Sequence, residues 1–309
     1  MSGRRVALTG ATGLIGGRLL ARLREDGAET TILTRNAART RQRLSLTSSE
    51  RALDWQPTSE AAPADALRGR DAVVHLAGEP IAQRWSEDVK RELRDSRVLG
   101  TQNLVAALRE LSDDERPRTL ISGSAVGYYG PRGEEPLDED APAGSDFLAT
   151  VCREWEHEAA LASELGVRVV HVRTGVVLDR SGGALAKMLP PFRLGIGGPV
   201  AGGEQFMSWV HADDIVGLIA AALSDERWNG PVNASAPVPV TNRDFSRALG
   251  RALRRPALLP VPGVALHLLY GEMAEIVTTG QRAVPAKALV LGYEFAQPDL
   301  DAALRDALS

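Results

Sequence analysis

A glycine-rich turn near the start of the chain constrains the fold more than any other feature. The stretch GATGLIG places Gly10, Gly13 and Gly16 three residues apart, after the apolar run RRVALT and before the helical pattern LIGGRLLARLRE. The first glycine permits a tight turn, the second lets a phosphate approach the backbone, and the third lets the helix pack closely on the strand. Free amides at the start of such a helix attract negative charge. The turn therefore predicts a β-α unit that binds a dinucleotide.

The rest of the first half alternates short apolar runs with helix-length segments. Further strands are predicted at residues 28–35, 51–55, 71–78, 118–124 and 167–178. Between them, residues 86–111 and 145–166 have the length and apolar periodicity of helices. Strands separated by helices form a parallel sheet with right-handed crossovers. We therefore predict an α/β fold built on a Rossmann-like, doubly wound parallel sheet.

The end of the second predicted strand indicates which coenzyme is bound. Folds that prefer NAD usually carry an acid there, about 20 residues beyond the glycines, to hold the ribose hydroxyls. This chain has Thr34 and Arg35 instead, in TILTRNAARTR. Arg35 can stack on adenine and pair with a 2′-phosphate, with Arg39 or Arg41 as a second cation. The alternative interpretation of these arginines is a solvated helix face. We predict NADP(H).

The pattern of the sequence changes after Leu178. Turns rich in Gly and Pro interrupt the chain, a strand and a helix resume in FMSWVHADDIVGLIAAAL, and Pro-punctuated segments follow, where Thr241 or Asn242 is predicted to cap a helix. We predict an NADP-binding Rossmann domain at residues 1–178, completed by 206–236. A smaller C-terminal substrate lobe is predicted from residues 179–205 and 237–309.

Composition excludes several classes of partner. Of 309 residues, 44% are hydrophobic and 25% charged, and the net charge is -4, which favours neither nucleic acid nor an anionic membrane as a partner. No apolar stretch reaches the roughly 20 residues of a membrane span. The first residues lack a signal-peptide pattern, and the one cysteine, Cys152, excludes an intramolecular disulfide. We expect a cytoplasmic protein with a small-molecule substrate, and we leave its oligomeric state open.

Longer motifs resemble those of the extended short-chain dehydrogenase/reductases. They run along nearly the whole chain and include HLAGEPI, DSRVLGT, SGSAVGYYG, SWVHADDI and NRDFSRALGRAL. The stretches LAGEPI and ALAKMLPPFRLG are similar to epimerase-family proteins of the nucleoside-diphosphate-sugar epimerase type, which carry a small C-terminal domain of unknown function. The resemblance implies hydride transfer on a small polar substrate, either sugar-nucleotide-like or a carbonyl compound.

The resemblance also implies positions for the site. Ser124 matches the catalytic serine or threonine that hydrogen-bonds the substrate oxygen, although a small residue ending a strand is the alternative interpretation. Arg97 stands where typical members have asparagine. The expected coenzyme contacts are Gly10, Thr12, Gly13, Leu14, Ile15, Gly16, Thr34, Arg35, Arg39, Leu76, Ala77, Gly78, Arg97, Arg173 and Gly175.

The family's acid/base pair is absent. Typical members carry Tyr-x-x-x-Lys, whose lysine binds the nicotinamide ribose and lowers the tyrosine pKa. Alignment on Glu156 puts Leu148 at the tyrosine position and Cys152 at the lysine position. Leucine has no proton to exchange, and a thiol on an apolar helix face is poorly ionised. We therefore expect an atypical site, with Cys152 as a buried helix residue.

Other side chains are candidates for the missing acid. Tyr128 or Tyr129 is the predicted proton donor, with Glu79 and Lys187 as alternatives, and each of the four also has an ordinary packing or surface interpretation. The five scattered histidines show no ligand spacing, so no metal site is predicted. Asp213 and Asp214 are expected to cap a helix.

Two functions follow from these residues. The first is an NADP-dependent enzyme of epimerase or oxidoreductase type. The alternative is a non-catalytic NADP(H)-binding regulatory or sensor protein, because Leu148 and Cys152 replace the acid/base pair.

Overall fold

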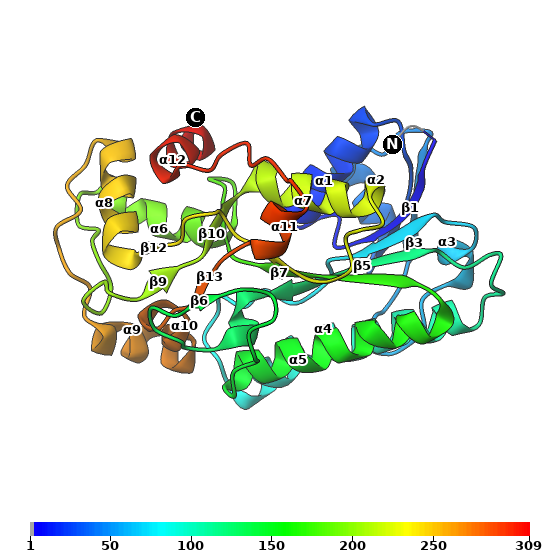
Figure 1. Ribbon diagram of the computed structural model, residues 1–309, viewed down its shortest axis with the longest axis horizontal. Helices are drawn as coiled ribbons and strands as arrows, with labels where there is room; N and C mark the ends of the chain where they lie inside the picture. Colours follow the sequence, from blue (N-terminus) through cyan, green and yellow to red (C-terminus); the bar gives the residue numbers. More distant parts are fainter. Residues whose placement is uncertain (1–2) are drawn as a thin grey trace.

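Seven parallel strands form the central sheet of the computed structural model, which describes residues 3–309 (Figure 1). The strand order is β11-β7-β5-β4-β1-β2-β3, and every neighbouring pair is parallel. The strands are β1 (Arg5–Thr9), β2 (Glu29–Thr34), β3 (Glu50–Asp54), β4 (Ala72–His75), β5 (Thr119–Ala125), β7 (Arg168–Thr174) and β11 (Gly230–Ala234). The predicted Rossmann-like, doubly wound sheet is confirmed.

Helices cover both faces of this sheet (Figure 1). One face carries α1 (Leu14–Glu25), α2 (Ala37–Leu44) and α7 (Ala212–Ser224), and the other carries α3 (Ala64–Leu67), α4 (Glu87–Arg109) and α5 (Phe147–Ala160), which continues as the 3-10 turn η2 (Leu161–Leu165). Each face has its own buried apolar cluster. Among the helices of residues 3–309, none combines the length and apolar character needed to cross a bilayer.

Shorter strands and helices form the rest of the molecule. β8 (Val176–Leu178) pairs with β10 (Trp209–His211), β9 (Phe206–Met207) with β12 (Val240–Thr241), and β13 (Arg282–Ala283) with β6 (Pro136–Leu137). The helices are α6 (Gly183–Arg193), α8 (Asn242–Leu253), α9 (Gly263–Tyr270), α10 (Glu275–Thr278), α11 (Ala286–Val290) and α12 (Leu300–Leu308), with 3-10 turns η1 (Val126–Tyr129) and η3 (Gly271–Ala274). A third apolar cluster joins α6, α8 and α12. Of the two predicted caps of α8, Thr241 is the N-cap, and its hydroxyl accepts a hydrogen bond from the Asp244 amide.

Two elements differ from the sequence prediction. The single strand expected at residues 167–178 divides at Gly175, where a Cβ atom would lie 2.2 Å from the Ser208 carbonyl oxygen, so the chain leaves the sheet there and continues as β8. The strand β11 was not predicted, because Pro231 and Asn233 obscure its pattern. As an edge strand, β11 tolerates the proline.

Candidate active site

The glycine turn joins β1 to α1 in the geometry that the sequence predicts. Gly10 has a φ of 71°, and a Cβ atom at Gly16 would lie 2.2 Å from the Gly10 carbonyl oxygen. Gly13 is the N-cap of α1 and offers no side-chain acceptor, and the first helical turn contains no acid. The first amides of α1 are therefore available to an anionic ligand. Thr12, Leu14 and Ile15 belong to the same turn and are half-buried.

A buried hydrogen-bond lock holds the loop after β4 beside this turn. The Thr9 hydroxyl lies 2.8 Å from His75 Nδ1 and accepts hydrogen bonds from the Leu76 and Ala77 amides, both at 3.1 Å. Burial lowers the pKa of His75 to about 4, so its imidazole is neutral and Nδ1 can accept the Thr9 proton. The lock fixes the backbone of two predicted coenzyme residues. Sequence reasoning missed it, although a polar residue at the end of each buried strand was a usable signal.

The end of β2 faces the same loop. Arg35 is exposed, and its Nη1 lies 2.6 Å from the Glu79 carboxylate, four residues beyond the end of β4. Thr34 is half-buried and hydrogen-bonded to the Thr40 hydroxyl at 2.9 Å. Arg35, a predicted coenzyme contact, and Glu79, a candidate proton donor, therefore form an ion pair with each other.

The arginines of α2 point in different directions. Arg39 is exposed at the start of the helix. Arg41 donates to the Ala52 carbonyl of β3 at 2.8 Å, which takes its guanidinium away from the glycine turn. Arg43 donates to the Thr12 carbonyl at 3.2 Å and so reaches the turn itself. The structure therefore offers Arg43, which was not among the predicted residues, in place of Arg41.

Arg97 supports the backbone of the β4 loop. Its guanidinium donates to the carbonyls of Leu93 and Glu79, both at 3.0 Å, and a Cβ atom at Gly78 would lie 3.2 Å from its Cζ. Arg97 was predicted as a coenzyme contact. The observed hydrogen bonds direct its guanidinium to the protein backbone instead.

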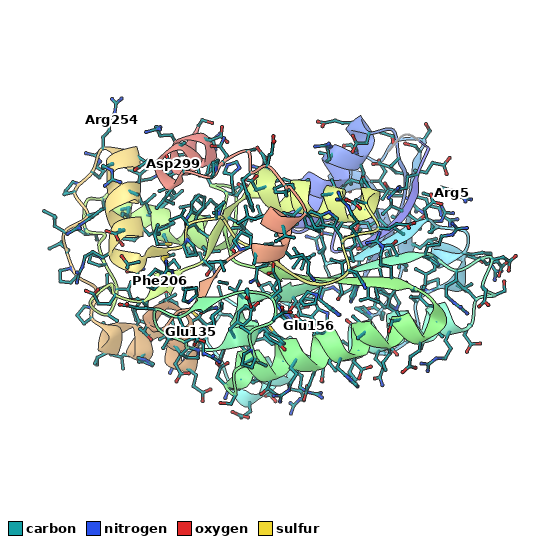
Figure 2. The ribbon with its side chains drawn as sticks, in the orientation of Figure 1. Arg5, Glu135, Glu156, Phe206, Arg254 and Asp299 are labelled. Atoms are coloured by element: carbon teal, nitrogen blue, oxygen red, sulfur yellow. The ribbon has the colours of Figure 1, made fainter. Side chains whose placement is uncertain are left out.

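Ser124, the last residue but one of β5, lies in a buried polar cluster. Its hydroxyl donates to Glu156 Oε1 at 2.6 Å, and Glu156 accepts two hydrogen bonds from Arg173, both at 2.9 Å. Figure 2 shows Glu156 between α5 and the sheet. Burial opposes the charge of Arg173, but hydrogen bonding and attraction to Glu156 raise its pKa overall. The Arg173 side chain, only 3% exposed, is therefore a partner of Glu156, and its contact with the coenzyme stays a prediction.

The predicted acid role of Tyr129 does not fit its surroundings. The Tyr129 hydroxyl lies 2.7 Å from Asn233 Oδ1 and accepts a hydrogen bond from Arg173 at 2.9 Å. Its side chain is fully buried, and burial raises its pKa to about 12. Tyr129 is therefore a structural residue. Tyr128 is half-buried, and its ring centre lies 3.5 Å from the Arg173 guanidinium carbon, so it is the tyrosine that remains near the surface.

The positions of the missing pair lie on α5. Leu148 is half-buried beside Gly127. Cys152 is 4% exposed, and burial raises the pKa of its thiol to about 12, so the expectation of a buried, un-ionised helix residue is confirmed. Neither side chain can exchange a proton at neutral pH.

Other candidates have structural partners. Lys187 of α6 donates to the Ala82 carbonyl and so joins the lobe to the β4 loop. Helix α7 is capped by His211, which accepts from the Asp213 amide at 3.2 Å. Asp214 does not cap this helix as predicted, because its carboxylate accepts from the amides of residues 296 and 297 at 2.7 and 3.0 Å.

One group with possible metal ligands is brought together by the fold. His211, Asp213 and Asp306 offer ligand atoms within 4.8 Å of one another. The two carboxylates flank opposite ring nitrogens, with Asp306 3.2 Å from Nε2 and Asp213 3.7 Å from Nδ1. Arg18 also donates to Asp213, at 3.0 Å. The arrangement links α1, α7 and α12 through polar contacts, and sequence spacing could not reveal it because Asp306 is remote in the chain.

Comparison with known proteins gives consistent matches over nearly the full length. The profile of the NAD dependent epimerase/dehydratase family matches residues 6–234, and that of a domain of unknown function (DUF1731) matches residues 261–307. The epimerase family protein SDR39U1 homolog, chloroplastic, of Arabidopsis thaliana is 42% identical over 303 residues, which is 97% of this chain and 85% of that protein.

Solved structures agree with these matches. The crystal structure of human epimerase family protein SDR39U1 (isoform2) with NADPH is 34% identical, covers 99% of both chains and superposes with a TM-score of 0.85. UDP-glucuronic acid 4-epimerase from Bacillus cereus, solved with UDP-glucuronic acid and NAD, covers 98% of both chains with a TM-score of 0.78. At 17% identity, that second likeness concerns the fold alone.

Proposed function

The chain belongs to the NAD dependent epimerase/dehydratase family, as its motifs predict, and from that premise we propose that it binds NADP(H) and transfers hydride to or from a small polar substrate. The observation that carries the proposal is the cradle of Gly10, Gly13 and Gly16 below the uncapped start of α1, with Arg35 directly after β2, the strand next to β1. A related human protein was solved with NADPH. In this proposal, residues 1–178 and 206–236 hold the coenzyme, and residues 179–205 and 237–309 form the substrate lobe.

The proposed proton path runs through Ser124 and Glu156, and the hydrogen bond between them supports it. Bound NADP(H) supplies the hydride donor or acceptor. The Ser124 hydroxyl gives its hydrogen to Glu156, so the Ser124 oxygen is free to accept a proton from a substrate hydroxyl. As the substrate carbon loses hydride, its hydroxyl proton passes to Ser124 Oγ and the Ser124 proton passes to Glu156. The reverse direction returns both. Arg173 holds the Glu156 carboxylate in place through two hydrogen bonds, so that Glu156 faces the Ser124 hydroxyl.

A second function has its own support. Leu148 and Cys152 leave the site without the usual acid/base pair, and Tyr129 is buried in structural hydrogen bonds. These observations favour a non-catalytic NADP(H)-binding regulatory or sensor protein. For the enzyme of the first proposal, Tyr128, which lies beside Arg173, is the alternative proton donor to Ser124.

Coenzyme titration tests the binding step. NADPH should bind more tightly than NADH, and Arg35→Asp should reverse that order because the added carboxylate repels a 2′-phosphate and can hold ribose hydroxyls. Arg254→Asp is the matched control, since Arg254 lies on the lobe far from the glycine turn (Figure 2). Equal affinity of the wild type for both coenzymes would refute the NADP(H) assignment.

A substrate screen separates the two functions. NADPH oxidation is followed with aldehydes, ketones and nucleotide sugars, together with product epimerisation. Ser124→Ala should lower the rate about 100-fold and leave the NADPH Kd unchanged, because the lost hydrogen bond is made to the reacting oxygen. Tight NADPH binding with no turnover of any substrate would favour the sensor function.

A further inference from the structure

We propose that Glu79 tunes the affinity of the site for 2′-phosphorylated ligands: its carboxylate holds Arg35 in an ion pair, and a 2′-phosphate has to displace this carboxylate to bind the guanidinium. This inference rests on the proposed binding of NADP(H). Its basis is the ion pair between Arg35 Nη1 and Glu79 Oε1, 2.6 Å apart.

The pair crosses the glycine turn. The sheet order places β1 between β4 and β2, so Glu79 and Arg35 lie in the segments that follow the strands on either side of β1, and Gly10 directly follows β1. Neighbouring strands are about 4.8 Å apart, so the ends of β4 and β2 are separated by about 10 Å. The ion pair spans this gap above the place where a dinucleotide follows the turn onto the end of β2. A 2′-phosphate bound at this place therefore competes with Glu79 for the Arg35 guanidinium.

The two partners are not equally free to move. Glu79 is fixed through its backbone, since its amide donates to the Ser96 hydroxyl and its carbonyl accepts from Arg97, both at 3.0 Å. The Glu79 side chain is 32% exposed and that of Arg35 is 69% exposed. Arg35 is thus the partner that swings, and it pairs with whichever anion the site offers.

The chemistry of the competing anions sets the discrimination. A 2′-phosphate presents three oxygens and a charge near -2, so it replaces the single Glu79 carboxylate with a stronger partner for the guanidinium. Arg43, hydrogen-bonded to the Thr12 carbonyl, adds a second cation on the same side of the turn. NADH carries no 2′-phosphate and so has no anion at this position that could replace the Glu79 carboxylate as the partner of Arg35. Glu79 therefore weakens the binding of ligands whose 2′-phosphate pairs with Arg35, whereas ADP and NADH leave the ion pair in place.

The test uses the adenosine half of the coenzyme, so that it does not depend on turnover. Binding of adenosine 2′,5′-bisphosphate and of ADP is measured by calorimetry, and NADPH and NADH by fluorescence, in wild type and Glu79→Gln. Removing the competing carboxylate should tighten the 2′-phosphorylated ligands about two- to five-fold, as expected for loss of an exposed ion pair. ADP and NADH should bind as in wild type.

Two further variants make the result specific. Asp301→Asn breaks an equally exposed ion pair, with Arg251 on the lobe, and should leave all four affinities unchanged. In an Arg35→Ala background, Glu79→Gln should have no effect. The proposal is overturned if Glu79→Gln leaves 2′-phosphate binding unchanged, weakens it, or tightens ADP equally. Wild-type protein that binds none of the four ligands would overturn the proposed function as well.

Discussion

The buried His75 makes the stability of this protein sensitive to mild acid. In the folded chain its pKa is about 4, against 6.5 for a solvated histidine, because burial penalises the charged ring. Between these values the unfolded chain binds a proton that the folded chain does not. Stability from this group is therefore complete above pH 6.5 and is lost as the pH falls toward 4.

The size of this effect follows from the two pKa values. Linkage gives a loss of about 2 kcal/mol in the free energy of unfolding between pH 7 and pH 4.5. His75→Asn keeps an acceptor for the Thr9 hydroxyl but has no titrating ring, so this variant should lack that part of the pH dependence. Its lower absolute stability, from the smaller side chain, does not enter the comparison.

The assay is urea unfolding of wild type and His75→Asn at both pH values, which gives a difference of differences. Carboxylates that titrate in the same range affect both proteins equally and cancel. The exposed His157→Asn serves as the control and should keep the wild-type pH dependence. Parallel pH dependence in wild type and His75→Asn would show that His75 is solvated or already charged, and the described lock would be wrong.

Three other substitutions test the site. Glu156→Gln leaves the buried Arg173 guanidinium without its counter-ion, so it should lower the free energy of unfolding by about 3–5 kcal/mol in urea titration. A loss below about 1 kcal/mol would contradict the buried pair. Gly16→Ala should abolish NADPH binding in a fluorescence titration, whereas Gly17→Ala, with its nearest contact at 3.5 Å, should bind normally, and equal binding by both would refute the cradle. Tyr129→Phe should cost about 1–2 kcal/mol of stability, because Asn233 loses a partner, while any NADPH oxidation rate stays as in wild type, and a large rate loss would restore Tyr129 as the acid.

Local sequence patterns were sufficient for the sheet and the coenzyme turn. The glycine spacing depends on close contacts within one β-α unit, so Gly10 and Gly16 reveal their roles without knowledge of the rest of the chain. Continuous apolar runs predicted six of the seven strands of the described sheet, and β11 escaped because Pro231 and Asn233 interrupt its pattern.

The polar chemistry of the site was less predictable, because its partners are far apart in the chain. From the sequence, Tyr129 is a candidate catalytic residue. In the structure its hydroxyl is hydrogen-bonded to Asn233 and Arg173, and neither of them lies near it in the sequence. Arg173 gave one usable signal, since a charge within the apolar run VVHVRTG requires a buried counter-ion. The direction of each α2 arginine depends on tertiary contacts, so Arg41 and Arg43 could not be distinguished by position alone.

The contacts of α7 have a consequence for biosynthesis. Tyr293 and Phe295 pack against the apolar cluster shared by α1 and α7, and the Asp214 carboxylate is satisfied by amides of residues 296 and 297. A ribosome delivers the whole central sheet before it delivers these residues. One apolar face of the nascent sheet therefore stays incompletely covered until residues 293–297 leave the ribosome. Exposed apolar surfaces of this kind are prone to aggregate. A chain truncated after β11 would contain every strand of the central sheet but would lack the residues that cover part of this apolar cluster.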